Sequence, residues 1–283
     1  MALSSVNTNM SAMVALQALQ STNAQLQAIQ KHVATGLRVS DAVDDGAAYA
    51  VAQSIRSTAG ALTSANQQLG SVQGLLQTTK TGLNDTSNTM ATMRNVLVKL
   101  SDSSTNVADR ANYIQQYNSL LANVKTFIQD ANYNGKTLIG NMSGSNGTFS
   151  RVAVARNDVG STYGIATFSG SALYGSLAFT AAQMNGGATV AGLISASGTF
   201  INQFNSLSKA LNTVGSEVTY VNNQVSYNSD KIDAMNAGLG SLVDADLAKE
   251  SAQLQALQIR QQLGTQALSI ANQAPAALLS LFK

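Results

Sequence analysis

Residues Ser241–Lys283 read SLVDADLAKESAQLQALQIRQQLGTQALSIANQAPAALLSLFK, and this closing stretch decides the fold. Its apolar and small residues recur at alternating steps of four and three, the spacing of one face of a coiled-coil helix. Between Glu250 and Lys283 the only formal charge belongs to Arg260. We therefore expect a helix that other helices cover on more than one side. The face consists of Val243, Leu247, Glu250, Leu254, Leu257, Gln261, Gly264, Leu268, Ala271 and Leu278.

The opening stretch offers a counterpart to this helix. Its apolar residues also follow heptad steps, with one shortened step after Met13, and no charged residue precedes Lys31. Two uncharged heptad helices at opposite ends of the chain predict that the terminal segments pair with each other. The residues on the opening face are Leu3, Val6, Met10, Met13, Leu16, Leu19, Leu26, Val33 and Leu37.

Composition excludes several classes of function. The net charge is +2, and the sixteen basic residues are scattered along the chain, so no nucleic-acid-binding surface is expected. The absence of Cys excludes disulfides and thiolate metal sites. No stretch approaches eighteen apolar residues, and no basic region followed by an apolar run opens the chain. We expect neither membrane insertion nor a cleavable signal peptide.

Two long helical rods are predicted between the ends. Gly36 is a helix stop, and Asp41 with Asp44 resembles the N-cap of the next helix, with Asp45 in its first turn. A three-four alternation then runs from Ala48 to Leu100, a rod on the order of 80 Å at about 1.5 Å per residue. A shorter helix is expected over 107–128, and Asn134-Gly135 predicts a hairpin turn.

The second rod starts near Phe200 and lies antiparallel to the first. Gly238 and Gly240 end it, and Ser241 with Asp244 restarts the closing helix. Between the rods, the residues after Asn141 are rich in Gly, Ser and Thr and contain short alternating runs, which favour a small β-rich insert. The fold class is mainly α: long antiparallel helical rods, paired N- and C-terminal coiled-coil helices and this insert. The expected domains are 1–38 with 241–283, 39–140 with 200–240, and 141–199.

Several motifs resemble those of bacterial flagellins. Thr35-Gly-Leu-Arg38, the Ser40–Asp45 run and the following Ala47–Ala52 are similar to the N-terminal signature of that family, and Asn132–Leu138 resembles its Asn-Gly hairpin. The C-terminal signature is matched by Ser241–Leu247, Gln261–Gly264, Ala271–Pro275 and Leu278–Lys283. The resemblance covers about residues 1–140 and 200–283. The signature positions are Gly36, Leu37, Arg38, Asp44, Asp45, Asn134, Gly135, Asp244, Asp246, Asn272, Gln273 and Pro275.

The resemblance implies a structural subunit that polymerises into the flagellar filament used for swimming. Its partners would be many copies of itself, other flagellins, and the export chaperone, cap and junction proteins. The chain would leave the cell through the flagellar type III apparatus and reside in the extracellular flagellum. The residues expected to pack in the polymer core are Leu16, Leu19, Leu26, Val33, Leu247, Leu254, Leu257, Leu268 and Leu278. A hook-filament junction protein, which shares the same helical plan, is the alternative.

No catalytic, cofactor-binding or metal-binding residue is assigned. His32 is the only histidine, so a two-histidine zinc site is excluded, and it is interpreted as a helix-end residue. The acidic pairs Asp41 with Asp44 and Asp244 with Asp246 could bind a cation, but helix caps explain them with fewer assumptions. The Ser and Thr residues of 141–200 are consistent either with O-glycosylation, as in many flagellins, or with loop composition.

Overall fold

The computed structural model describes the backbone of residues 8–280 and the side chains of residues 8–273. Helices dominate the described chain. They are α1 (Met10–Thr35), α2 (Gly46–Ser101), α3 (Val107–Asp130), α4 (Gly170–Leu177), α5 (Ala181–Asn185), α6 (Gly187–Leu193), α7 (Thr199–Val243) and α8 (Leu247–Ser280). The strands are β1 (Lys136–Thr137), β2 (Thr148–Phe149), β3 (Val152–Ala155) and β4 (Thr162–Ile165).

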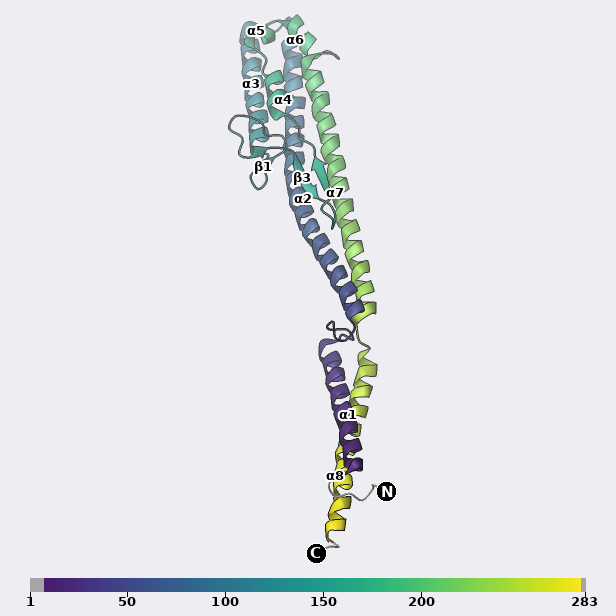
Figure 1. Ribbon diagram of the computed structural model, residues 1–283. Helices are drawn as coiled ribbons and strands as arrows, with labels where there is room; N and C mark the ends of the chain where they lie inside the picture. The colour runs from purple at the N-terminus through teal and green to yellow at the C-terminus, as the bar shows by residue number, and fades with distance from the viewer. Residues whose placement is uncertain (1–7, 281–283) are drawn as a thin grey trace. The chain divides into compact units, whose positions relative to one another are not determined.

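The chain divides into two compact units (Figure 1). One unit combines Met1–Ser57 with Asp233–Lys283 and holds the terminal helices, while the other spans Thr58–Ile232. In the first unit α1 ends as the sequence predicts. Gly36 takes a left-handed φ of 72°, and its N–H donates to the carbonyl of His32. A glycine suits this position because a side chain strains a backbone with positive φ.

The α7–α8 junction differs from the prediction. α7 continues through Gly238 and Gly240 to Val243, and Ser241 lies in its last turn, where its Oγ donates to the Gly238 carbonyl. The helix stops because the backbone next pairs with the loop after α1. The Ala245 N–H donates to the Gly36 carbonyl at 2.9 Å, and the Arg38 N–H donates to the Val243 carbonyl at 2.8 Å. This pairing, rather than the glycines, ends the rod.

Two helix caps also lie further along the chain than predicted. Asp45, not Asp41, caps α2, because its Oδ1 accepts from the N–H groups of Ala47 and Ala48. Asp41 and Asp44 instead fold the preceding turn through the amides around them. At α8, Asp246 rather than Ser241 supplies the cap, accepting from the N–H groups of Ala248 and Lys249.

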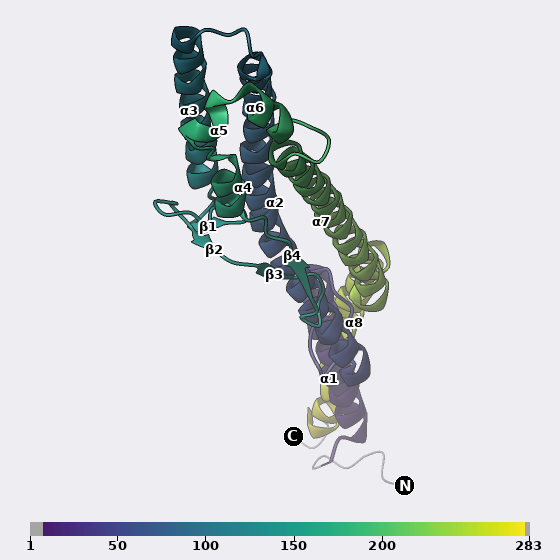
Figure 2. The ribbon, with the colours of Figure 1, turned by 90° about the horizontal axis from the view of Figure 1, so that it is seen from above.

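The second unit is built on α2 and α7, which run antiparallel (Figures 1 and 2). Asn66 and Gln73 of α2 hydrogen-bond to Ser229 and Asn222 of α7, so the residue numbers rise on one helix as they fall on the other. Helices α3 and α4 lie beside α2 in Figure 2. The inner face of α2 is fully buried and carries Leu69, Leu76, Leu83, Met90, Met93, Leu97 and Leu100.

Arg110 closes the end of α2 in a way that the sequence pattern does not indicate. It is buried, and its guanidinium donates to the carbonyls of Leu100, Asp102 and Met184 at 2.8–3.1 Å. Helix C-termini leave carbonyl groups without partners, and guanidinium is the side chain with the most donors to satisfy them. Arg110 therefore joins α2, α3 and the end of α5.

The predicted hairpin turn is confirmed. Asn134 and Gly135 both have positive φ, 49° and 73°, and Tyr133 and Lys136 exchange backbone hydrogen bonds across the turn. The insert holds the two expected alternating runs as β3 and β4, which pair antiparallel from Val152 opposite Ile165 to Ala155 opposite Thr162. It also holds α4, α5 and α6, which the Gly, Ser and Thr composition does not predict.

Candidate assembly surface

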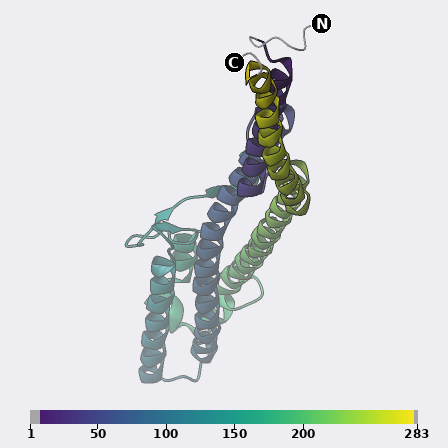
Figure 3. The same cartoon turned by 90° about the horizontal axis from the view of Figure 1, so that it is seen from below.

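The terminal helices α1 and α8 lie antiparallel in direct contact (Figures 1 and 3). Three polar contacts define their register. The Asn9 Nδ2 donates to the Ala271 carbonyl at 2.6 Å, and the Gln261 Nε2 donates to the Asn23 Oδ1 at 2.8 Å. Closer to the other end of the pair, the His32 Nδ1 lies 3.6 Å from the Glu250 Oε2. The prediction that the terminal segments pair is confirmed.

The seam between α1 and α8 is narrow. Its buried apolar side chains are Leu26, 8% exposed, and Leu257, 7% exposed. Gly264 admits a close approach, since a Cβ there would lie 3.2 Å from the Leu19 Cδ1. Of the residues predicted on the seam, the following are half-buried: Leu19, Val33, Leu37, Glu250, Leu254, Gln261, Gly264, Leu268 and Ala271.

Some predicted seam residues do not contribute to the α1–α8 contact. Met10, Met13 and Leu16 are exposed, and Leu247 is 49% exposed. The apolar pattern shifts phase at the shortened step, and an α-helix cannot follow such a shift without rotating its face. The seam continues in phase through Asn9, Ala12 and Ala15, which are half-buried. The predictions for Leu3, Val6, Pro275 and Leu278 lie outside the side chains that the structure describes.

Outside the seam, both helices of the α1–α8 pair carry exposed apolar side chains. We call this set the terminal apolar face; it consists of Met10, Met13, Val14, Leu16, Ile259, Leu263 and Ile270, which are 44–68% exposed. Two shallow grooves cross the pair, of about 440 Å³ beside Val14 and Ala267 and of about 400 Å³ beside Ile29 and Ala256. Exposed apolar side chains in this number are typical of a protein interaction surface.

Comparison with known proteins identifies the family. Residues 6–144 match the family described as bacterial flagellin N-terminal helical region, and residues 195–282 match the bacterial flagellin C-terminal helical region. The chain belongs to the bacterial flagellin family. It is 33% identical over 287 residues to flagellin FljM of Caulobacter vibrioides, covering 100% of both chains. It is also 33% identical over 292 residues to a flagellin of Brucella melitensis, covering 99% of this chain and 100% of the relative.

A solved structure supports the fold. It is described as a flagellar hook-associated protein from Vibrio parahaemolyticus and superposes with a TM-score of 0.57 at 14% identity. It covers 71% of this chain and 100% of the other, and at this identity the likeness concerns the fold alone. As a flagellin, the chain is a structural subunit of the bacterial flagellar filament, which lies outside the cell.

Several flagellin signature residues gather within the first unit, at the loop after α1 and the break between α7 and α8. Leu37 and Asp244 form an isolated antiparallel bridge, and the Arg38 Nη2 donates to the Leu242 carbonyl at 2.7 Å. Beside them Val39, Ala48, Ala52 and Val243 form a small buried cluster. These signature positions, together with Gly36, Asp45 and Asp246, fasten the loop after α1 to the break between α7 and α8. Asn134 and Gly135 lie in the other unit, and Asn272 and Gln273 are exposed on α8.

Asp44 is the most perturbed carboxyl at this junction. Its Oδ2 accepts from the N–H groups of Ser40 and Asp41 and from the Ser40 hydroxyl, and Lys31 Nζ lies 3.1 Å away. The amide of Ser40, followed by the Lys31 ammonium, lowers the pKa of Asp44 far below the usual carboxyl range. Lys31 also contacts Asp41, which lowers the pKa of that carboxyl. The acidic cluster is thus satisfied by the amides of its own loop and by Lys31 of α1.

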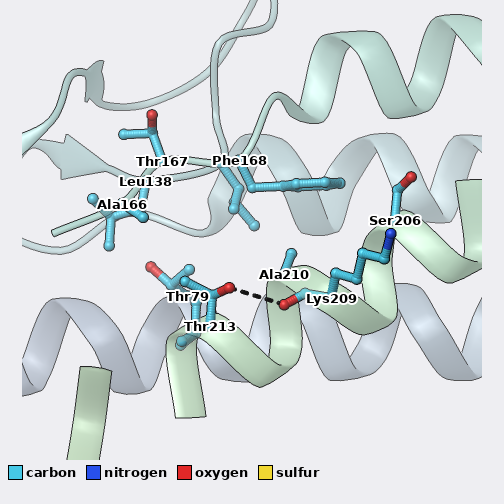
Figure 4. Close-up of a pocket in the computed structure, with 11 residues that line it drawn as sticks. Thr79, Leu138, Ala166, Thr167, Phe168, Ser206, Lys209, Ala210 and Thr213 are labelled. Atoms are coloured by element: carbon cyan, nitrogen blue, oxygen red, sulfur yellow. Dashed lines mark hydrogen bonds between the residues drawn. The ribbon is translucent and has the colours of Figure 1, made fainter. Parts of the chain in front are cut away.

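The described residues contain no cluster of candidate metal ligands. Within 8–273 no three His, Asp or Glu side chains are grouped so that they could hold a metal ion. No described helix combines the length and hydropathy that crossing a membrane requires. A cavity of about 220 Å³ lies between α2, α7 and residues 166–168, lined mainly by Leu138, Phe168, Ala210 and Val214, with Lys209 at its edge (Figure 4).

Proposed function

We propose that the terminal apolar face packs against other copies of this flagellin in the interior of the filament. The observation that carries the proposal is the mismatch between sequence pattern and burial in the α1–α8 pair. Both helices carry heptad patterns almost free of charge, yet Leu26 and Leu257 are their only buried apolar side chains in the described region. Further helices would bury the rest, each large side chain contributing roughly 1.5–3 kcal/mol.

Folding of the terminal segments would then be coupled to assembly. A helix pair with so little internal burial gains most of its stability from neighbours, which order it as they bind. In this arrangement Leu19, Leu26, Val33, Leu254, Leu257 and Leu268 close the pair itself. The exposed Leu16 and Leu247 contact adjacent copies.

The chain is divided, in this proposal, according to distance from the filament axis. Segments 1–38 and 241–283 form the core domain, 39–140 with 200–240 form the rod domain, and 141–199 form the variable outer insert. The insert contains β3 and β4, and along β3 the buried Val152 and Val154 alternate with less buried residues, as expected for a strand with one solvated face. We assign no enzymatic role to the protein.

Further partners are expected at the steps by which a filament subunit is exported and assembled. An export chaperone would hold the terminal segments before secretion, because an exposed apolar face in the cytoplasm is prone to aggregate. Cap and junction proteins would meet the same face at the ends of the filament, and other flagellins would pack beside it. Export would proceed through the flagellar apparatus.

Electron microscopy of the purified chain at raised concentration tests the proposal. Long helical fibres are expected from the native chain. Changing Leu263 and Ile270 together to Gln is expected to raise the concentration needed for polymerisation at least about tenfold, since losing roughly 1.4 kcal/mol changes an equilibrium tenfold. Val107→Gln, at an 86% exposed site on α3, is the control and should polymerise like the native chain. Chains that only join preformed ends, or a double variant with normal fibres, would overturn it.

A further inference from the structure

His32 and Glu250 form an unusual pair in the α1–α8 seam. The His32 Nδ1 and Glu250 Oε2 lie 3.6 Å apart, and the two side chains are 16% and 12% exposed. Both atoms are shielded from solvent, and neither has a hydrogen-bond partner. Leaving such a donor or acceptor buried and unpaired is destabilising, and more so when the group is charged. The two atoms face each other across the helices, so each is the other's available partner.

The other polar contacts across this seam do not titrate. Asn9 bonds to the Ala271 carbonyl, and Gln261 bonds to Asn23, in both cases between neutral groups. His32 is the single histidine of the chain, and Glu250 is the last acidic residue before the C-terminus. The His32–Glu250 contact is therefore the one described point of the seam where gain or loss of a proton changes the charge of an interhelical contact.

Neighbouring charged groups are bound elsewhere or solvated. On α1 and its following loop, Lys31 contacts Asp41 and Asp44, and the Arg38 Nη2 donates to the Leu242 carbonyl. On the other side, Asp246 accepts from the first amides of α8, while Asp244 and Lys249 are exposed. Asp45 caps α2. None of these groups forms a hydrogen bond with the His32 Nδ1 or the Glu250 Oε2.

We propose that His32 and Glu250 form a proton-dependent clasp across the α1–α8 pair. A proton on Nδ1 joins the two atoms by a charge-assisted hydrogen bond once the side chains close the 3.6 Å gap. Loss of the positive charge leaves a buried carboxylate without a cation opposite it. The clasp therefore tightens the helix pair while the imidazole is charged and the carboxylate is ionised. It weakens when the imidazole is neutral, the state that a higher pH favours for a histidine.

The effect on polymers rests on the assembly role proposed above, so the test uses filaments. The rate of heat-induced dissociation is measured at pH 6 and pH 8 for the native chain, His32→Gln and Glu250→Gln. The ratio of the dissociation rate at pH 8 to that at pH 6 is expected to be about threefold larger for the native filament than for either variant. An effect of this size is expected for a partly exposed ion pair. Gln261→Ala, which removes a neutral contact of the same seam, is the control and should keep the native pH ratio.

A direct measurement accompanies the rates. With ¹⁵N-labelled histidine, the sole imidazole of the filament is read by solid-state NMR at pH 6, where a proton on Nδ1 close to a carboxylate carbon is expected in the native chain and is lost in Glu250→Gln. Equal pH ratios in the native chain and Glu250→Gln, with an unchanged imidazole spectrum, would overturn the clasp while leaving the filament proposal standing. Failure of the native chain to polymerise would count against the filament proposal, and the same spectrum recorded in solution would then decide the clasp.

Discussion

The helix pair α2–α7 and the helix pair α1–α8 share a heptad pattern but differ in what covers it. Along α2, Leu69, Leu76 and Leu97 are completely buried, because α3, α4 and the β3–β4 hairpin add further layers to the unit. Along α1 and α8 the same kind of side chain is mostly half-buried or exposed. A heptad pattern thus indicates where a helix needs a partner, but not whether its own chain supplies enough of them.

Deletion of residues 241–283 is expected to show the largest difference between the two helix pairs. We expect polymerisation to be abolished, because the deletion takes away α8 and three of the seven residues of the terminal apolar face. The second unit, which ends at Ile232, should keep its helices. Sedimentation and electron microscopy would follow assembly, and circular dichroism the helices. A truncated chain that still makes fibres would show that the rods alone can assemble.

A matched pair of leucine truncations comes next in size. Leu97→Ala, at a fully buried site of α2, is expected to lower the free energy of unfolding of the dispersed chain by about 2–5 kcal/mol. Leu257→Ala, in the terminal seam, should lower it by less than about 1 kcal/mol while weakening polymerisation. Urea unfolding of the unpolymerised protein measures both. Equal losses in that assay would mean that the terminal pair is as firmly folded as the rods.

Glu217 provides a smaller test inside the second unit. It is 5% exposed, its Oε1 accepts from the Ala166 N–H at 2.7 Å, and its Oε2 has no partner. Burial raises the pKa of this carboxyl, so the folded unit holds the proton more tightly than the unfolded chain, and the resulting stability is lost as the pH rises through the raised value. Glu217→Gln is expected to stabilise the unit at pH 7 by about 1 kcal/mol. Thermal unfolding at pH 5 and 7 should show the advantage shrinking at the lower pH.

The Lys231–Asp158 ion pair should give the smallest effect. The Lys231 ammonium lowers the pKa of Asp158, and the two groups are 2.9 Å apart at the turn between β3 and β4. Lys231→Met is expected to cost about 0.5 kcal/mol at pH 7, since both side chains are partly exposed. Because the pKa of Asp158 is lowered in the folded state, the difference should disappear as the pH falls through the carboxyl range. A difference that persists at pH 2 would point to lost packing of the lysine stem.

Much of the helical layout could be predicted from local signals. The long alternations of apolar residues marked α2 and α7, the Gly36 stop was found where expected, and Asn134-Gly135 formed the expected turn. Single caps were harder, since Asp41, Asp44 and Asp45 all suit a helix start and only the surrounding backbone selects Asp45. The helices α4 to α6 were not predicted, because short helices in Gly-rich sequence depend on the core they pack against.

Contacts between distant parts of the chain were even harder to predict from the sequence. Arg110 and Asn228 are buried, and their partners lie on other elements: Asn228 donates to Asn66 of α2 and to the carbonyl of Arg156 in the hairpin. The terminal face was assigned to assembly from its lack of charge, but the exposure of Met10, Met13 and Leu16 could not be read from spacing, because both phases of the pattern are apolar.

By itself, the sequence determined that this chain is a set of long helices whose uncharged ends pair, and its motifs resemble those of flagellins. Periodicity and glycine stops depend on residues that are close in the sequence, so they can be recognised without knowledge of the fold. Only the tertiary structure decided which face of α1 meets α8, which aspartates cap helices, and that His32 lies opposite Glu250. Those outcomes depend on how two helices rotate against each other, and a rotation is set by all of their contacts together.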